Sequence, residues 1–273
     1  MKIWGNTIVK NEDRYLWFAV KSVVDFLDKI LVWDTGSSDN TVPIIKLLQK
    51  QYPKKIVFEE IGSVNADGLT KARQEMLDQT LSDWLLILDG DEVWWKSSIK
   101  KTMEVMQKQG DNLYALVNPV VNVIGDIYHY QEEAAGRYQI LGKKGHLNIR
   151  AINRKISGIH IKNQYPLEGF YDKHENLIQE VDEKLIFVDA PLLHFTHLVR
   201  SSKLLEDRQT MGRSKKTKYE LGIPFAKDFN YPEVLYLDKP SIVLSPWVKM
   251  TTSYKLRAAF ETPLKRLKRK LDE

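Results

Sequence analysis

Three carboxylates, those of Asp89, Asp91 and Glu92, directly follow an apolar run at residues 84–88. A short apolar run that ends at charged residues is typical of a buried strand in a parallel sheet. Ligands of open α/β sheets bind beyond the carboxyl ends of the strands. Side chains alternate along an extended chain, so Asp89 and Asp91 are expected on the same side, with Gly90 allowing a bend and a close ligand. This arrangement suits Mg²⁺, which takes one or two carboxylates together with phosphate and water oxygens.

The elements that precede these carboxylates decide between a metal site and a solvated acidic turn, because Asp-x-Asp also arises by chance. Strands and helices are predicted in alternation, beginning with a strand, at residues 2–9, 15–27, 30–33, 41–52, 56–58, 69–77 and 84–88. This order predicts an α/β fold with a mainly parallel central sheet flanked by helices. Asn11, Glu12, Asp34 and Asp67 follow the earlier strands, so they are expected at the same sheet edge as the three carboxylates.

The composition is that of a soluble globular protein, with 273 residues, 43% hydrophobic content and 28% charged content. The chain has no cysteine, which excludes disulfides and thiolate metal sites and fits a cytoplasmic location. The amino terminus lacks the apolar region of a signal peptide, and no apolar stretch reaches the roughly 20 residues of a membrane span. The net charge is +5, and the basic excess lies in the last third of the chain.

The second half of the sequence has a weaker pattern. A helix is expected at residues 97–109, loop-rich chain at 128–144, and strands at 113–123, 147–153 and 184–188. The chain is expected to divide into an α/β domain at residues 1–200 and a basic, mostly helical extension at residues 201–273.

The carboxyl-terminal segment is a basic amphipathic sequence. Its apolar residues share one helical face: Leu256, Phe260, Leu264, Leu267 and Leu271. Pro263 is expected to begin a second helical segment. The apolar face either packs on the main domain or lies on an anionic membrane surface. A nucleic-acid role is disfavoured, because aromatic residues are not interleaved with the basic ones.

Four segments together resemble the family 2 glycosyltransferases, which have the GT-A fold. They are Val9-Lys10-Asn11-Glu12, Val32-Trp33-Asp34-Thr35-Gly36-Ser37-Ser38-Asp39-Asn40-Thr41, Ala72-Arg73-Gln74, and the run from Trp84 to Glu92. The resemblance is good over about the first 100 residues and looser to about residue 200. The pair His174-Glu175 and the segment that ends at His194 resemble the lipopolysaccharide core-type branch of the family. Neither a dinucleotide-binding fingerprint nor a P-loop sequence occurs.

The resemblance implies the inverting transfer of a sugar from a nucleotide-sugar, of the UDP or GDP type, to a glycan, lipid-linked or small hydroxyl acceptor. It implies Mn²⁺ or Mg²⁺ as the cofactor. Asp91 would be a metal ligand, and His194 would contact the metal or the diphosphate, with His197 as the alternative histidine. A core histidine is the competing interpretation of His194.

The resemblance also implies a nucleotide-sugar pocket. Asp34 would accept hydrogen bonds from the base or ribose, and Asp89 would lie near the ribose. The other residues that match the family's pocket are Val9, Asn11, Glu12, Asp67 and Arg73. Two of these assignments have structural alternatives, because Asp34 can cap the next helix and Arg73 can pair with acids on its own helix.

Inversion needs a carboxylate that takes the proton of the acceptor hydroxyl from the side of the sugar opposite the leaving group. Glu175 is the first choice, because His174-Glu175 precedes His194 in a pattern similar to the core-type branch. Glu168 is the second choice and Asp172 the third.

Two other functions use similar residues. A sugar-phosphate nucleotidyltransferase also combines an α/β sheet with acidic metal ligands. It should carry a glycine-rich basic loop after the first strand, where this chain has Lys10-Asn11-Glu12-Asp13. A non-catalytic nucleotide-sugar binding protein would keep the pocket and lack the base.

Overall fold

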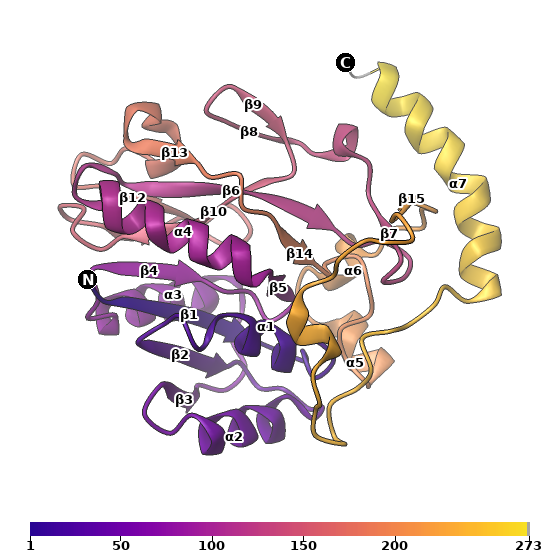
Figure 1. Ribbon diagram of the computed structural model, residues 1–273, viewed down its shortest axis with the longest axis horizontal. Helices are drawn as coiled ribbons and strands as arrows, with labels where there is room; N and C mark the ends of the chain where they lie inside the picture. Colours follow the sequence, from indigo (N-terminus) through magenta and orange to yellow (C-terminus); the bar gives the residue numbers. More distant parts are fainter. Residues whose placement is uncertain (272–273) are drawn as a thin grey trace.

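The computed structural model describes residues 1–271 and shows a mixed α/β fold around one large sheet (Figure 1). Within this range the main sheet has nine strands, in the order β3-β2-β1-β4-β10-β6-β14-β5, with β13 also paired to β6. The strands are β1 (Ile3–Val9), β2 (Lys29–Asp34), β3 (Ile56–Glu60), β4 (Trp84–Ile87), β5 (Glu92–Trp94), β6 (Ala115–Asn122), β10 (Leu147–Asn153), β13 (Leu185–Phe187) and β14 (Leu192–His194). The expected α/β fold is confirmed.

The first four strands form the parallel half of the sheet. β1 pairs in parallel with β2 and β4, and β2 pairs in parallel with β3. The register places Val9 opposite Asp34, so the loops that follow β1 and β2 leave the sheet at the same level. The intervening helices are α1 (Leu16–Val23), α2 (Thr41–Gln51) and α3 (Ala66–Gln79). Every element predicted in this half is present, with its ends shifted by a few residues.

The other half of the sheet is mixed. β10 runs antiparallel to β4 and β6, and β5 runs antiparallel to β14, whereas β13 and β14 run parallel to β6. Only the turn at residues 88–91 separates β4 from β5, yet β5 lies at the far edge of the sheet. This turn therefore carries the chain from the centre of the sheet to its edge and places the acidic residues at the junction.

Strand β4 is buried on both faces, which explains its uninterrupted apolar sequence. Leu86 belongs to the larger apolar cluster, with residues of α1, of α2 and of α4 (Lys96–Gln109). Leu85 belongs to a second cluster on the opposite face, with Ile178 and the partly buried Phe170. The end of β4 is thus held rigidly from both sides.

Short elements fill the region between β6 and β14. They are the hairpins β8 (Tyr138–Ile140) with β9 (Lys143–Gly145) and β11 (His160–Lys162) with β12 (Gly169–Tyr171), the strand β7 (His129–Tyr130), and the 3₁₀ turns η2 (Glu133–Ala135), η3 (Ile178–Glu180) and η4 (Asp182–Lys184). Strand β7 pairs with β15 (Ile223–Pro224), which follows β14, and the 3₁₀ turn η1 (Gly110–Asn112) precedes β6. The loop-rich prediction for residues 128–144 missed the β8–β9 hairpin, because strands of three residues are too short to show a period.

The last part of the chain contains α5 (Leu204–Gln209), α6 (Arg213–Lys216), the 3₁₀ turn η5 (Glu233–Tyr236) and the long helix α7 (Thr252–Leu271). Helix α7 continues through Pro263, where the sequence predicted the start of a second segment. The Thr262 hydroxyl accepts from the Leu221 amide at 3.0 Å and donates to the Ala258 carbonyl, which anchors the helix at this point. None of the helices within residues 1–271 combines the length and the apolar character that a membrane span requires.

The apolar face of α7 points away from the domain. Its apolar side chains are 58% to 82% exposed: Leu256, Phe260, Leu264, Leu267 and Leu271. Helix α7 instead buries Ala258 and Thr262. The interpretation in which this apolar face packs on the main domain is therefore wrong.

Candidate functional site

The turn at residues 88–91 connects β4 to β5, which pairs with β14. We call the group of Asp89, Glu92 and His194 at this turn the acidic corner. Glu92 opens β5 and lies opposite His194 in the β5–β14 pairing. One ligand atom from each of Asp89, Glu92 and His194 lies within 4.8 Å of the others. Oε2 of Glu92 is buried and has no hydrogen-bond partner within the described chain. Two carboxylates and an imidazole form a donor set that suits Mn²⁺ and accepts Mg²⁺.

Arg150, on β10, balances the charge of this corner. Its Nη2 contacts Oε1 of Glu92 and lies 3.2 Å from Oδ2 of Asp89. Burial raises the pKa of Glu92 to about 7, against the opposing effect of Arg150. Burial also disfavours the charged form of Asp89, but Arg150, Arg73 and His194 together hold the pKa of Asp89 below its usual range. The corner therefore holds one ionised carboxylate and one whose charge depends on pH.

Asp91 has different partners from Asp89. Its Oδ2 accepts from Nη1 of Arg200 at 2.6 Å and lies 3.4 Å from Nε2 of His194. Burial opposes its ionisation, but Arg200 and His194 hold the pKa of Asp91 well below its usual range. The expectation that Asp89 and Asp91 share a side assumed an extended chain, whereas the chain turns between them. The metal-ligand role of Asp91 stays a prediction.

Gly90 lets this turn pack against the loop after β1. A Cβ on Gly90 would lie 3.0 Å from Cγ1 of Val9 and 3.1 Å from Cγ of Glu12. The space beside Gly90 is thus occupied by the side chains of Val9 and Glu12.

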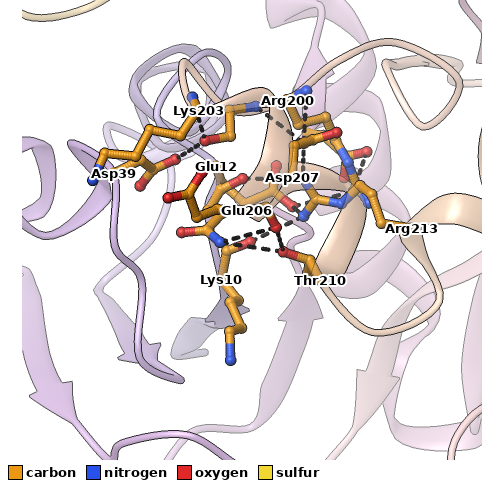
Figure 2. A network of polar contacts seen from close by, with 12 residues as sticks. Lys10, Glu12, Asp39, Arg200, Lys203, Glu206, Asp207, Thr210 and Arg213 are labelled. Carbon is orange, nitrogen blue, oxygen red and sulfur yellow. Dashed lines mark hydrogen bonds and ion pairs between the residues drawn. The ribbon is translucent and has the colours of Figure 1, made fainter.

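Two arginines from the carboxyl-terminal third hold the loop after β1 (Figure 2). Glu12 lies 3.1 Å from Nη1 of Arg200 and 2.7 Å from Nη2 of Arg213. Arg213 also donates to the Lys10 carbonyl at 3.0 Å and to Asp207 at 2.7 Å. Burial raises the pKa of Glu12 to about 7, although both arginines act against this shift. Arg213 and Asp207, expected in the extension, therefore belong with Arg200 to the frame of the site.

The loops after β1 and β2 are hydrogen-bonded to each other. Asp34 accepts from the amides of Gly36 and Ser37, both at 2.9 Å. Oδ1 of Asn11 accepts from the Ser38 amide at 2.9 Å, and the Val9 carbonyl accepts from the Thr35 amide at the same distance. Asp34 thus shapes its own turn.

The helix-cap alternative for Asp34 does not apply. Asp39, not Asp34, accepts from the amide of Thr41 at the start of α2. The nucleotide-binding roles of Asp34 and of Asn11 stay predictions.

A small cavity of about 20 Å³ lies behind Asp89, lined also by Arg73 and Phe170. Nε of Arg73 lies 3.5 Å from Oε1 of Glu168. Oε2 of Glu168 is buried and has no hydrogen-bond partner among residues 1–271. Glu168 therefore contacts Arg73, which lines the same cavity as Asp89. Asp67, by contrast, pairs with Lys71 at 2.8 Å on the exposed surface of α3.

The other two base candidates lie further along the β11–β12 segment. Glu175 is 57% exposed and pairs with Lys162 at 2.7 Å and with His160 at 3.4 Å. Asp172 accepts from the amides of His174 and Asn176, at 2.8 and 3.0 Å, and so braces its loop. Of the three carboxylates, Glu168 is the one that contacts a residue of the Asp89 cavity.

His197 does not face the carboxylates of the corner. Its Nδ1 lies 2.8 Å from the Lys216 carbonyl and its Nε2 lies 3.3 Å from Oε1 of Gln131. Burial lowers the pKa of His197 to about 3. His194 is the histidine that lies at the corner.

Three arginines of this site were not predicted from the sequence, namely Arg150, Arg200 and Arg213. Arg150 had a signal, because it is the one charged residue of the strand at residues 147–153. A charged residue in a buried strand needs an opposite charge beside it. Arg200 and Arg213 lie in a generally basic stretch, where nothing distinguishes them from surface residues.

The model of "Glycosyl transferase family 2" matches residues 7–165. The chain is 33% identical over 90 residues to a TPR repeat-containing protein of Synechococcus elongatus, a match of 31% of this chain and 19% of that protein. It is 29% identical over 99 residues to the SPbeta prophage-derived glycosyltransferase SunS of Bacillus subtilis, a match of 36% of this chain and 22% of the relative. The matched region thus spans about a fifth of the length of these relatives.

Among solved structures, S. aureus TarS 1-349 in complex with UDP-GlcNAc aligns with a TM-score of 0.47 and 14% identity. This alignment covers 71% of this chain and 58% of that one. The family model covers more than half of the chain, so the expected family is confirmed, while the lipopolysaccharide core-type branch stays a prediction. The chain belongs to glycosyl transferase family 2 and carries its glycosyltransferase domain.

Proposed function

We propose that this chain catalyses the inverting, metal-dependent transfer of a sugar from a UDP- or GDP-sugar to a hydroxyl acceptor. The observation that carries the proposal is the corner of Asp89, Glu92 and His194, whose ligand atoms converge within 4.8 Å at the end of β4 in a family 2 chain. Ligands of α/β sheets bind at this end of the strands. The nucleotide is assigned to the loops of Asn11 and Asp34, beside the corner.

Asp89, Glu92 and His194 are the residues that would hold Mn²⁺ or Mg²⁺. Asp91 is the alternative ligand, because it lies 3.4 Å from Nε2 of His194. The unpartnered, buried Oε2 of Glu92 supports this fit, since a bound cation would satisfy it. The ion would offset the negative charge that develops on the departing nucleoside diphosphate.

Transfer forms a bond between the acceptor oxygen and the anomeric carbon, while the bond from that carbon to the diphosphate breaks. The diphosphate leaves with the electron pair, and the hydroxyl proton passes to a carboxylate. We assign this base to Glu168 in preference to Glu175. Glu168 is partly buried beside Arg73 near Asp89, whereas Glu175 is exposed and already bound by Lys162 and His160.

Calorimetry with UDP and with GDP, each with and without Mn²⁺, tests the metal-dependent donor site. Binding of one nucleotide that strengthens with Mn²⁺ is the expected result. Binding that is absent or indifferent to the metal contradicts the proposal. A screen of nucleotide-sugars for donor hydrolysis then identifies the sugar.

We further propose that α7 contacts an anionic membrane surface from the cytoplasmic side. The exposed apolar face of Leu256, Phe260, Leu264, Leu267 and Leu271 supports this contact. The same helix carries Lys255 and Lys270, whose charges complement anionic headgroups. An acceptor linked to a lipid would meet the site at such a surface.

A further inference from the structure

A cleft of about 810 Å³ lies between the end of the main sheet and α7. Asn122 at the end of β6 and His194 at the end of β14 line its inner side, and Lys265, Lys268 and Arg269 of α7 line its outer side. Helix α7 runs along this side of the domain, beside β15 (Figure 1). His194 also belongs to the acidic corner, so the cleft opens onto the proposed transfer site. The nucleotide loops, by contrast, follow β1 and β2.

The charge of this cleft is strongly positive. No carboxylate of residues 1–271 lines it, and its cations are Arg137, Lys144, Lys215, Lys216, Lys218, Lys265, Lys268 and Arg269. Two of them are already paired, because Arg269 binds Glu220 and Glu132 and Lys265 binds Glu261. Within the described chain, no ion pair involves Arg137, Lys144, Lys215, Lys216, Lys218 or Lys268. Six of the eight cations that line the cleft thus have no carboxylate partner within residues 1–271.

The like charges in the cleft disfavour one another. Burial lowers the pKa of Lys218, and the charges of Arg269, Arg137 and Lys265 lower it further, although Glu220 acts against them. A bound anion would relieve this repulsion. Phosphate is a fitting anion, because it accepts charge-assisted hydrogen bonds from several cations at once.

The inner end of the cleft carries an uncharged hydrogen-bonding group, the side-chain amide of Asn122. Asn122 lies opposite His194 in the β6–β14 pairing. Its Nδ2 lies 2.9 Å from Nδ1 of His146, while its Oδ1 is buried and has no partner within residues 1–271. A free amide oxygen next to the proposed transfer site is suited to accept from a hydroxyl group of the acceptor.

We infer that this cleft is the acceptor site and that the acceptor carries a phosphate group, which binds the unpaired cations near α7 while a hydroxyl reaches the corner beside Asn122. This inference rests on the proposed sugar transfer and names the class of its acceptor. The phosphate belongs either to a lipid-linked acceptor or to a soluble sugar phosphate. Both acceptors would present the same phosphate group to the cations of the cleft.

The test compares a cleft variant with a charge-matched control. Lys218→Gln/Lys268→Gln removes two cleft cations, and Lys50→Gln/Lys100→Gln removes two exposed lysines of α2 and α4. The probes are inorganic phosphate and glucose 6-phosphate, measured by calorimetry. The cleft variant is expected to bind both probes about tenfold more weakly or worse, and the control within about twofold of the wild type. Circular dichroism confirms that both variants fold.

Binding of UDP with Mn²⁺ separates the cleft from the donor site. It should be unchanged in both variants, so a failed donor site and a failed cleft give different results. The inference is overturned if the wild type binds neither probe, if both variants weaken equally, or if UDP binding falls with phosphate binding in the cleft variant.

Vesicles identify the source of the phosphate. Phosphatidylcholine vesicles are compared with vesicles that also contain phosphatidic acid. A lipid source predicts that binding to the phosphatidic acid vesicles falls in the Lys218→Gln/Lys268→Gln variant more than in the control. A soluble source predicts equal vesicle binding in the two variants, together with the loss of glucose 6-phosphate binding in the cleft variant alone.

Discussion

Arg200 donates to Asp91 at 2.6 Å although 109 positions separate the two residues in the chain. Both side chains are buried, and Arg200 also lies 3.1 Å from Glu12. This arginine therefore joins the loop after β1, the turn after β4 and the carboxyl-terminal third. The distant segment thus supplies a buried contact to the acidic turn after β4.

Removal of Arg200 should destabilise the whole domain. Arg200→Ala leaves Asp91 and Glu12 buried without their shared cation, and breaking a buried pair in this way costs about 3–5 kcal/mol. Urea unfolding followed by circular dichroism measures the loss. Arg208→Ala is the matched control, because Arg208 is exposed on α5. Equal stability of the two variants would contradict a structural role of Arg200.

Glu12 should make stability depend on pH. Its pKa is raised by burial from 4.5 to about 7, so the folded state binds a proton that the unfolded state has released. The contribution of Glu12 is therefore most favourable below about pH 4.5, and it is lost as the pH rises to about 7, by roughly 3 kcal/mol.

Glu12→Gln should remove this trend, so that the unfolding free energy of the wild type falls relative to that of the variant as the pH rises from about 4.5 to about 7. Urea unfolding at several pH values between 4.5 and 8 measures the difference. The exposed Glu104→Gln should follow the wild type at every pH. A wild type and a Glu12→Gln variant with parallel profiles would show that Glu12 titrates normally.

The assignment of the metal ligands can be tested with conservative changes. Glu92→Gln and His194→Gln should each abolish the strengthening of UDP binding by Mn²⁺, because each removes one donor from the corner. Asp91→Asn should lower stability, because it removes one of the two carboxylates that pair with the buried Arg200. Calorimetry with and without Mn²⁺ measures both effects. If Asp91→Asn alone abolishes the metal effect, Asp91 is the ligand and Glu92 is not.

Glu168→Gln and Glu175→Gln distinguish the two base candidates. Loss of a general base lowers kcat by about 10²–10⁴, and we expect this loss for Glu168→Gln with UDP and Mn²⁺ binding unchanged. Glu175→Gln should retain activity within about threefold, because Glu175 is exposed. Steady-state rates with the donor found by the hydrolysis screen measure both. The opposite ranking would restore Glu175 as the base.

The local sequence pattern predicted where the strands end, but it did not predict which distant residues contact the side chains at those ends. The apolar run before Asp89 and the alternation of strands and helices predicted the sheet edge, because periodicity reports burial of nearby residues. Arg150 and Glu92 lie 58 positions apart, and Arg213 and Glu12 lie 201 apart. Such pairs leave no periodic signal. The position of Glu168 depends on the β11–β12 hairpin, whose strands have three residues each.

The exposed face of α7 allows a test that does not disturb the fold. Phe260 and Leu264 are 82% and 62% exposed, so Phe260→Ser/Leu264→Ser removes apolar surface that the domain does not bury. Each large apolar side chain contributes about 1.5–3 kcal/mol when fully buried, so partial insertion of both predicts a loss of vesicle affinity of about tenfold or more. Cosedimentation with vesicles of phosphatidylcholine and phosphatidylglycerol measures the affinity, and thermal unfolding should be unchanged. Leu81→Ser is the control, because Leu81 is 75% exposed and lies far from α7 in the chain. Vesicle binding that is equal in all three proteins would leave α7 without a role at the membrane.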